Sequence, residues 1–576
     1  MIHYKVSTVH PHRHFITLEA LFPVDGRNEL ILQLPSWRPG RYELGNFAKN
    51  IRGWKVTSAE GKELTFEKTS KDTWRVDTIG LDCIKLNYQY YAAELNAGSS
   101  FLDEEQLYIN PVNCFFYDAS NPNQTFEIDL LVPSNYRVAT GLKKLSEHRL
   151  LASSFDELAD CPLIASATLK HLEYTVQGVN FHCWLQGDVN LNELRFTQDL
   201  KLFTQTQFDM FGDIPCAEYH FLFHFVPYFL RHGVEHSNST VIAMGPAADF
   251  QQEHLYKDLL GISCHELFHT WNVKNIRPVE MMPYDFTREN YSQQGYVYEG
   301  VTTYYGDLLL WRAGILSDDE WLDVIHDHIQ DYVNNHGRTN LSVADSSWDT
   351  WLDGYVAGIP WRKVSIYNEG FLIALMCDLI IMNQSSCAAS LDTALRSLYN
   401  QFGKQCRGYS GDDYLQLLNA CSEFDFTKLF ESLVHGTSDY VPHLRDALGL
   451  AGVELQEAPS AKWSESTLGL SLDEANQKVV VSAVVPDSPA DEAGLWYSDE
   501  IVAVNGIAPY KNIQHLLRLY ANSLELTVLR KGKRTIVQFA PDGKSWVVKY
   551  RCARETVVTP KQVQVWNHWM KGMRFS

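Results

Sequence analysis

The spacing of the hydrophobic residues changes twice along this chain of 576 residues. Up to about residue 170, apolar and polar residues alternate, as they do from Ile84 to Tyr90, and a period of two is that of half-buried strands. From about 190 to 450 the period is helical, and the capping box of Ser317 and Glu320 marks one helix start. Strands return from about residue 465. We therefore expect a multidomain α+β protein with an N-terminal all-β domain at 1–170, a mainly α domain at 171–455, a small β-rich module at 456–545 and a tail at 546–576.

The charge balance argues against two classes of partner. Asp and Glu total 70 against 49 Lys and Arg, which gives a net charge of −21. A surface this acidic repels phosphate backbones and anionic lipid, so neither nucleic acid nor a membrane is expected as the main partner. The longest apolar stretch, Phe371 to Met382, contains Asp378. It is too short to cross a bilayer and predicts a buried helix.

The expected location is the cytoplasm. The first ten residues lack the basic segment and apolar core of a secretory signal. Eleven cysteines, an odd number, occur singly from Cys83 to Cys552 without a CxxC pair. This pattern fits reduced thiols better than a disulfide framework.

The strongest chemical signal is the segment His265-Glu266-Leu267-Phe268-His269. Residues four apart lie on one face of a helix, so both imidazoles can reach one metal ion. Glu266 lies about a quarter turn round the helix, where it can act on a metal-bound water instead of on the metal. The motif predicts a zinc site.

A catalytic zinc also needs a third protein ligand and an open position for water. Glu299 follows His269 by 30 residues and begins a second predicted helix among apolar and aromatic neighbours. We expect the two helices to face each other across one Zn²⁺ ion held by His265, His269 and Glu299.

These ligands indicate amide hydrolysis, with peptide as the default substrate. Zinc lowers the pKa of its bound water towards about 7 and polarises the scissile carbonyl. Glu266 would act as general base, taking the proton of the water and passing it to the leaving amine. A structural zinc ion has no need of a base beside an open coordination position, which disfavours that alternative.

Over nearly its whole length the chain resembles the glycyl aminopeptidases, zinc enzymes that carry a C-terminal PDZ domain. The most specific likeness is His265 to Pro278, which resembles the zinc helix of the family and the segment after it. Residues 299–307 resemble the helix of the third ligand, and residues 35–42 are similar to the N-terminal β domain. The resemblance implies a thermolysin-like fold for the catalytic domain and the character of an exopeptidase.

That exopeptidase character depends on the segment from His232 to His236. It resembles the Gly-x-x-Glu motif that aminopeptidases of the aminopeptidase N type place on an edge strand before the zinc helix. A buried Glu235 near zinc could pair with the protonated α-amine of a substrate, and Gly233 and His236 are implied as further substrate contacts. The alternative is that Glu235 faces solvent from an edge strand and has no role in substrate binding. His232 stands where the family usually has Gly, a change that could narrow the pocket.

The oxyanion of the tetrahedral stage needs a donor, and Tyr367 resembles the tyrosine that fills this role in related aminopeptidases. A phenol is neutral at pH 7 yet donates strongly. Glu369 stands where Lys is common, so the local electrostatics differ. Tyr304 and Tyr305 are alternative donors, and Asp307 is a weaker candidate for steadying a ligand imidazole.

The module at 456–545 resembles a PDZ domain, most specifically in residues 493–495 and 499–506. Backbone amides near 468–470 could receive a terminal carboxylate while the peptide adds as a strand. In the alternative, the groove is blocked and the module only braces the catalytic domain. The tail, with Trp566 and Trp569, is expected to pack back onto the body.

These observations favour a zinc aminopeptidase that removes small N-terminal residues, Gly or Ala, from peptides with a free N terminus. One alternative is a zinc endopeptidase in which Glu235 is only structural, and N-acetylated substrates distinguish the two. The other is a PDZ peptide-binding scaffold with a vestigial zinc site. The intact His265, Glu266, His269 and Glu299 speak against a vestigial site.

Overall fold

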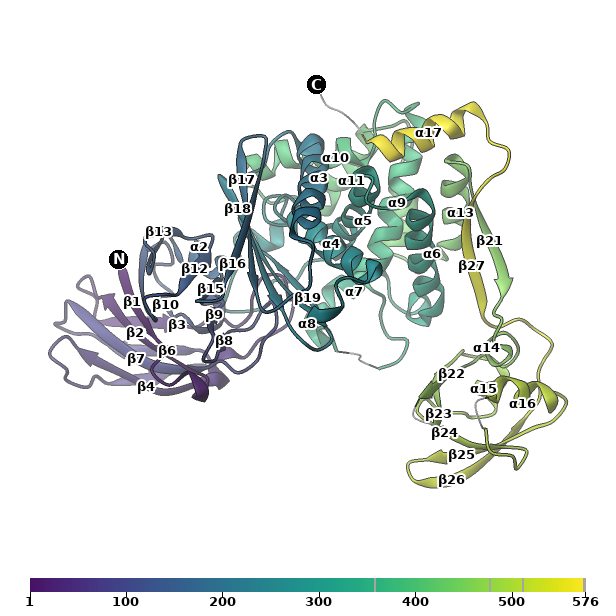
Figure 1. Ribbon diagram of the computed structural model, residues 1–576, viewed down its shortest axis with the longest axis horizontal. Coiled ribbons are helices and arrows are strands. Elements are labelled where there is room, and N and C mark those ends of the chain that lie inside the picture. The colour runs from purple at the N-terminus through teal and green to yellow at the C-terminus, as the bar shows by residue number, and fades with distance from the viewer. Residues whose placement is uncertain (357–358, 476–477, 510–511, 573–576) are drawn as a thin grey trace.

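The computed structural model describes residues 1–356, 359–475, 478–509 and 512–572. Figure 1 shows an elongated molecule with a β domain at its N-terminal end, a helical body in the centre and a small β-rich module at the far end. The predicted multidomain α+β organisation, with these three parts in this order, is confirmed.

The N-terminal domain contains three sheets. The largest has the order β13 (Lys143–Ser146), β14 (Arg149–Ala152), β11 (Phe126–Leu131), β1 (Ile2–Ser7), β2 (Phe15–Pro23), β7 (Cys83–Tyr91) and β4 (Ile51–Ser58). The others are β10 (Tyr117–Asp118), β3 (Glu29–Gln33), β6 (Thr73–Asp77) and β5 (Phe66–Lys68), and β12 (Arg137–Thr140), β15 (Leu163–Ser166), β9 (Gln106–Ile109) and β8 (Phe101–Leu102). The alternation predicted from Ile84 to Tyr90 is confirmed in β7, whose alternate residues are buried in the core of the domain.

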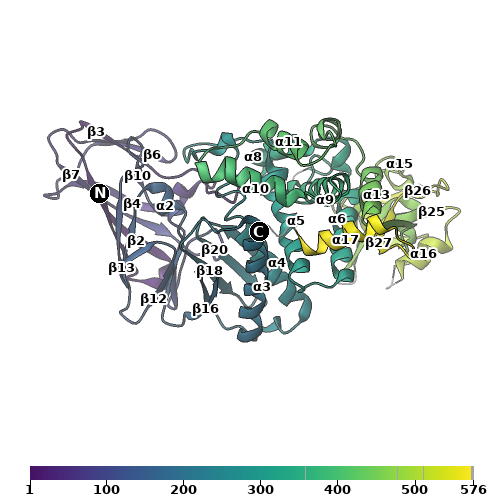
Figure 2. The same ribbon diagram turned by 90° about the horizontal axis from the view of Figure 1, so that it is seen from above.

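A five-stranded mixed sheet joins this domain to the helical body. Its order is β16 (Lys170–Val176), β17 (Val179–Gln186), β18 (Glu218–Phe225), β20 (Ser239–Gly245) and β19 (Leu230–Glu235). One face packs on the N-terminal domain through a cluster that includes Trp184, Val234 and Tyr108. The other face packs on α3 (Glu193–Phe211) and α4 (Glu253–Phe268), and Figure 2 shows the sheet between the two parts.

The helical body is built around α9 (Ile366–Gln384), which contains the apolar stretch noted in the sequence. Around it lie α5 (Thr302–Arg312), α6 (Asp318–Asn334), α10 (Leu391–Gln401), α11 (Gly411–Ala420) and α13 (Val441–Leu450). Shorter helices of the body are α7 (Val343–Trp348), α8 (Thr350–Asp353) and α12 (Thr427–Leu429), whereas α1 (Pro111–Cys114) and α2 (Phe155–Ala159) belong to the N-terminal domain. The predicted capping box of Ser317 and Glu320 begins α6. Although α9 is long and apolar enough to cross a membrane, 78% of that span is buried inside the protein, as expected of a core helix.

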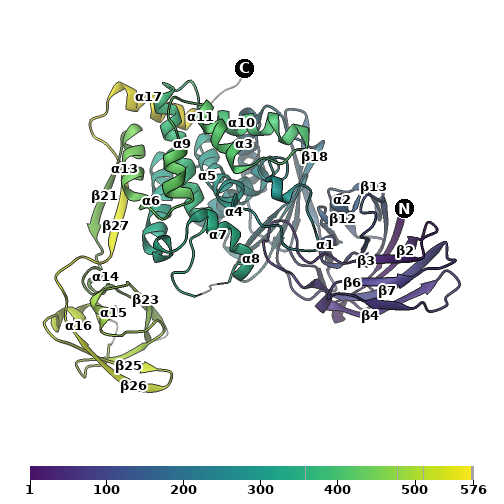
Figure 3. The same ribbon diagram turned by 180° about the vertical axis from the view of Figure 1, so that it is seen from behind.

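The C-terminal module is inserted between two paired strands. Strand β21 (Val453–Pro459) pairs with β27 (Val548–Arg554), and Figure 3 shows this ribbon leading from the body to the module. The module contains β22 (Leu470–Ala475), β23 (Lys478–Val484), β24 (Glu500–Val504), β25 (Leu524–Arg530), β26 (Lys533–Phe539), α14 (Trp463–Leu468), α15 (Pro489–Glu492) and α16 (Ile513–Leu519). Its sheet follows the order of the strand numbers, so β22 lies at an edge.

The tail returns to the body as α17 (Pro560–Lys571), as expected. Trp569 is fully buried against Trp311 and Trp321, and its Nε1 donates a hydrogen bond to the hydroxyl of Tyr304 over 2.7 Å. Trp566 also packs on Trp311. The last helix therefore completes the core of the helical body.

Candidate active site

A cavity of about 550 Å³ lies between the N-terminal domain and the helical body. Its walls come from residues 40–41 of the N-terminal domain, from β19, α4 and α5, and from the start of α9. Most residues predicted for the site line this cavity, namely Gly233, Glu235, His265, Glu266, His269, Glu299 and Tyr367.

Three donor atoms meet on one side of the cavity. His265 and His269, at the end of α4, have their Nε2 atoms 3.0 Å apart. Glu299 comes from the π-helical turn Tyr296–Val301 before α5, and such turns are frequent at functional sites. Its Oε2 lies 3.8 Å from His265 Nε2 and 3.4 Å from His269 Nε2. Ligands bound tetrahedrally to zinc at about 2.0–2.1 Å lie about 3.3 Å apart, so these donors fit one zinc ion.

Asn272 orients both parts of this cluster. The Nδ1 of His269 lies 2.7 Å from the carbonyl oxygen of Asn272. This contact assigns the proton to Nδ1 and leaves Nε2 free for a metal. The Asn272 side chain donates to the carbonyl of Val297 over 2.9 Å and to the hydroxyl of Thr302 over 3.1 Å. It thus ties the end of the zinc helix to the turn that carries Glu299.

Burial and mutual charge interactions shift the pKa values of all three side chains in this cluster. Burial by itself would raise the pKa of Glu299, but the neighbouring His269 and His265 outweigh burial and lower that pKa to about 2. Burial opposes the charged form of His269, yet Glu299 raises the pKa of this imidazole to about 9. Burial lowers the pKa of His265. A carboxylate shared by two imidazoles suits a bound cation.

Glu266 is 5% exposed, and its Oε2 has no hydrogen-bond partner among the described residues. Burial raises the pKa of this carboxyl to about 8, and a cation on the adjacent histidines would favour the carboxylate. Its other oxygen lies against Gly233 of β19, where a Cβ would come within 2.1 Å of Glu266 Oε1. The glycine therefore leaves the space that Glu266 occupies.

Replacing Gly233 with Ala should reduce kcat for a peptide substrate by about 100-fold, because the added methyl displaces the Glu266 carboxylate and a shift of about 1 Å can cost that much. Unfolding temperature and zinc content, measured by calorimetry and mass spectrometry, should stay close to the wild-type values. A fully active Gly233→Ala enzyme would show that the position of Glu266 is unimportant.

Glu235 ends β19, the edge strand, and is 3% exposed. The expected edge-strand position is therefore confirmed, and burial excludes the solvent-facing alternative. Its Oε1 has no hydrogen-bond partner in the described part of the chain. Glu235, Glu266 and His269 each have one atom able to bind a metal within 4.8 Å of the other two. Gly40 lies against it with φ +78°, and a Cβ there would approach Glu235 Oε2 to 2.3 Å. The N-terminal domain thus closes the cavity over Glu235.

His236, predicted as a substrate contact, does not line the cavity and is corrected here. Its Nδ1 lies 3.2 Å from Asp160 Oδ1, and the same carboxylate accepts a hydrogen bond from Lys274 over 2.6 Å. Side chains alternate along a strand, so Gly233 and Glu235 share the cavity face while His236 faces the N-terminal domain. His236 thus belongs to a polar contact between the two domains.

Among the tyrosines, Tyr367 lines the cavity, and burial, with Glu299 nearby, raises the pKa of its phenol well above the usual range. The rivals Tyr304 and Tyr305 are fully buried and donate to Asp378 and Asp392, each over 2.7 Å, so their hydroxyls face away from a substrate. Asp307 Oδ2 lies 3.9 Å from His328 Nε2 and faces that residue.

Two residues depart from the family pattern, His232 and Glu369, and only His232 lies at the cavity. His232 lines the cavity, and burial, together with Arg38 and Arg41, lowers the pKa of its imidazole to about 3. It is therefore neutral at pH 7. Glu369 does not line the cavity; it faces a separate small pocket beside Trp361.

Sequence reasoning missed several cavity residues. Arg41 and Arg231 bring positive charge to the wall, His328 comes from α6, and the hydroxyl of Tyr355 lies 3.5 Å from that of Tyr367. Arg231 could have been found from the alternation of β19, since it lies two residues before Gly233. The others come from distant parts of the chain and carry no local signal.

Comparisons with known proteins found similar domains and a similar overall fold. Three family models match the chain: the Peptidase M61 N-terminal domain at residues 3–167, M61 glycyl aminopeptidase at 258–373 and the PDZ domain at 480–530. A crystal structure of an aminopeptidase N family protein from Idiomarina loihiensis is similar to the chain, with a TM-score of 0.90 and 26% identity, over 98% of this chain and 100% of that one. An M1 zinc metallopeptidase from Deinococcus radiodurans is 14% identical, with a TM-score of 0.45, over 76% and 93%.

Two curated relatives from Bacillus subtilis match shorter regions. Serine protease Do-like HtrA is 29% identical over 248 residues, 40% of this chain and 53% of that protein. Serine protease Do-like HtrB is 33% identical over 94 residues, 16% and 20%. The chain thus spans about half of the length of HtrA and about a fifth of the length of HtrB. The regions that match the M61 N-terminal, M61 glycyl aminopeptidase and PDZ models occur in the order seen in the fold, so the chain is built from these three domains.

Proposed function

We propose that this protein is a zinc-dependent aminopeptidase that removes small N-terminal residues, Gly or Ala, from peptides with a free N terminus. The observation that carries the proposal is Glu235, a buried carboxylate in the same cavity as the His265, His269 and Glu299 cluster, with one oxygen that lacks a partner among the described residues. A buried carboxylate is best satisfied by a cation, and the α-ammonium of a peptide supplies one.

His265, His269 and Glu299 would hold the zinc ion, since their donor spacing fits it. Bound zinc would lower the pKa of a water molecule and polarise the scissile carbonyl. Glu266 takes a proton from the attacking water and gives it to the leaving amine. Glu235 holds the substrate ammonium, which places the first peptide bond at the reacting position. Gly40 of the N-terminal domain packs against that carboxylate and limits the space around it.

Tyr367 supplies the remaining donor, a neutral phenol for the oxyanion. Replacing it with Phe should lower kcat by about 100-fold with little change in KM, because the hydrogen bond is made mainly in the transition state. Steady-state kinetics on alanyl-p-nitroanilide would measure both. Tyr355→Phe is the matched comparison, and a larger loss in that variant would transfer the donor role to Tyr355.

The preference for small residues draws support from the family and from the wall of the cavity. His232 borders the cavity next to Gly233 on β19, at the position where the family usually has Gly. Alanyl- and glycyl-p-nitroanilide should therefore be cleaved faster than leucyl-p-nitroanilide. His232→Gly should narrow that difference.

The decisive experiment compares alanyl- and glycyl-p-nitroanilide with their N-acetylated forms. We expect hydrolysis of the free amines only, loss of activity after removal of metal with a chelator, and recovery with ZnCl2. Equal cleavage of the acetylated substrates would identify an endopeptidase. Activity that survives complete metal removal would overturn the zinc assignment.

We also propose that the PDZ domain accepts a peptide C terminus along the edge strand β22. The amide of Gly469 already donates to the carbonyl of Glu465 over 3.2 Å, which leaves fewer free amides for the carboxylate than the sequence suggested. Titration of fluorescent peptides with free and amidated C termini would test this. Equal binding of the two forms would rule out carboxylate recognition.

A further inference from the structure

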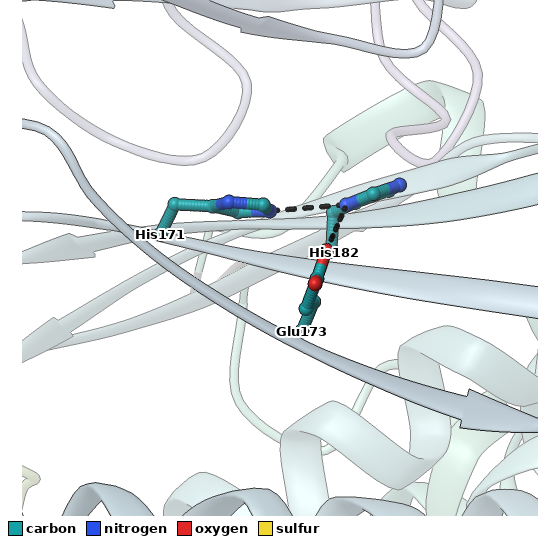
Figure 4. A group of neighbouring side chains, drawn as sticks. All are labelled: His171, Glu173 and His182. Atoms are coloured by element: carbon teal, nitrogen blue, oxygen red, sulfur yellow. Dashed lines mark hydrogen bonds and ion pairs between the residues drawn. The ribbon is translucent and has the colours of Figure 1, made fainter.

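A second group of metal-binding side chains lies on the mixed sheet, on strands β16 and β17. His171 and Glu173 are two residues apart on β16, and His182 on β17 pairs directly with Glu173. Alternation along each strand puts all three on one face. Figure 4 shows the three side chains converging, with both His171 and Glu173 reaching towards the His182 ring.

We propose that His171, Glu173 and His182 form a second site for one divalent transition-metal ion of the zinc or copper type. The Nε2 of His171 lies 3.0 Å from Nδ1 of His182, and Glu173 Oε2 lies 3.9 Å from the same Nδ1. Two imidazoles and a carboxylate are the donors that such ions prefer, and ligands of a tetrahedral zinc lie about 3.3 Å apart. Glu173 is solvent-exposed, so a small rotation brings its oxygen to that spacing and the ion can enter from water.

The outer environment of His182 is suited to this role. Its Nε2 lies 3.7 Å from the carboxylate of Glu218 on β18. With the ion on Nδ1, Nε2 carries the proton and points it at that carboxylate. A small shift of the exposed Glu218 side chain would bring this contact to hydrogen-bond length, at which an outer carboxylate orients a metal-bound histidine.

His220 completes a competing group with His182 and Glu218, but its tautomer argues against it. The indole Nε1 of Trp184 donates to His220 Nδ1 over 3.1 Å. The proton of a neutral ring is then on Nε2, which faces Glu218 Oε1 at 3.3 Å and has no lone pair for a metal. The metal is therefore assigned to the His171 side of His182.

Neighbouring groups hold the site in shape and set its charge. The His171 ring stacks on Trp184 with centroids 4.0 Å apart, which holds the imidazole in place. Arg137 and Lys144 lie over the same Trp184 ring, at 5.2 and 5.9 Å from its centroid. These cations are balanced by Glu173 and Glu218, so an ion would bring net positive charge to a nearly neutral patch. Moderate affinity is expected.

The proposed second metal site lies next to the contact between the mixed sheet and the N-terminal domain. Trp184 belongs to the apolar cluster that joins the mixed sheet to the N-terminal domain, and residues 40–41 of that domain close the catalytic cavity. An ion at β16 and β17 would stiffen the strands that carry this contact. It would be additional to the single zinc of the proposed active site.

The test counts zinc bound by the full-length protein. Equilibrium dialysis against buffered ZnCl2 with mass spectrometry should give one more equivalent in the wild type than in His171→Gln or His182→Gln, and His220→Gln should match the wild type. With the proposed active site first filled with one equivalent of Zn²⁺, Cu²⁺ electron paramagnetic resonance should show coupling to two imidazole nitrogens, reduced to one in His171→Gln. Activity on alanyl-p-nitroanilide, where present, should remain in all three variants, which separates this site from the proposed active site.

Equal zinc content in wild type and His171→Gln would overturn the proposal, as would loss of one equivalent in His220→Gln. Glu173→Gln covers the case in which a histidine variant fails to fold, because Glu173 is exposed and its amide changes no packing. We expect this variant to keep the wild-type unfolding temperature without added metal and to bind the second ion at least tenfold more weakly. Unchanged affinity in Glu173→Gln would also count against the site.

Discussion

Replacing Glu266 with Gln should lower kcat for alanyl-p-nitroanilide by about 10²–10⁴-fold, the range expected for loss of a general acid–base group. Gln has nearly the shape of Glu but cannot take a proton from water. Its amide also fits the space beside Gly233 that the carboxylate occupies. Zinc content should not change, because Glu266 is not among the three proposed ligands.

Glu369→Gln is the matched control for this prediction. Glu369 is also a buried glutamate whose pKa burial raises to about 8, yet it does not line the cavity. Its replacement should leave kcat within about threefold of the wild type. If both variants lose activity equally, the effect reports a general disturbance of the helical body, and the role of Glu266 as base is not supported.

The second large effect is expected for Glu235→Gln, which removes the carboxylate proposed to bind the substrate ammonium. Losing one partner of a buried charge pair costs about 2–5 kcal/mol, so kcat/KM for free-amine substrates should fall by about 30- to 5,000-fold. The corresponding values for N-acetylated substrates should hardly change. The preference of the enzyme for a free amine should therefore nearly disappear.

Glu235→Asp provides the comparison, because it keeps the charge and moves it by about one methylene. This variant should retain a clear preference for the free amine with a lower kcat. A Glu235→Gln enzyme that still cleaves only free-amine substrates would remove Glu235 from recognition of the amine. The closed wall formed by Gly40 would then be the better explanation for exopeptidase behaviour.

Local periodicity was enough to predict the elements and the centre of the site. The i, i+4 spacing of His265 and His269 puts both rings on one face of any helix, and the structure brings Glu299 to them from the turn before α5. The alternation in β7 and the capping box of α6 likewise depend only on neighbours in the chain. Such features are local, so they can be read without knowledge of the tertiary fold.

Contacts between distant segments could be decided only by the tertiary structure. Gly40 meets Glu235 across 195 positions, and Asp378 and Asp392 take the hydroxyls that made Tyr304 and Tyr305 plausible donors. The His236 side chain faces Asp160 because the N-terminal domain supplies this polar partner. The pairing register of β16 with β17 likewise brought Glu173 opposite His182. Sequence periodicity by itself determined which residues share a face of a helix or strand, whereas packing of the domains decided what each face meets.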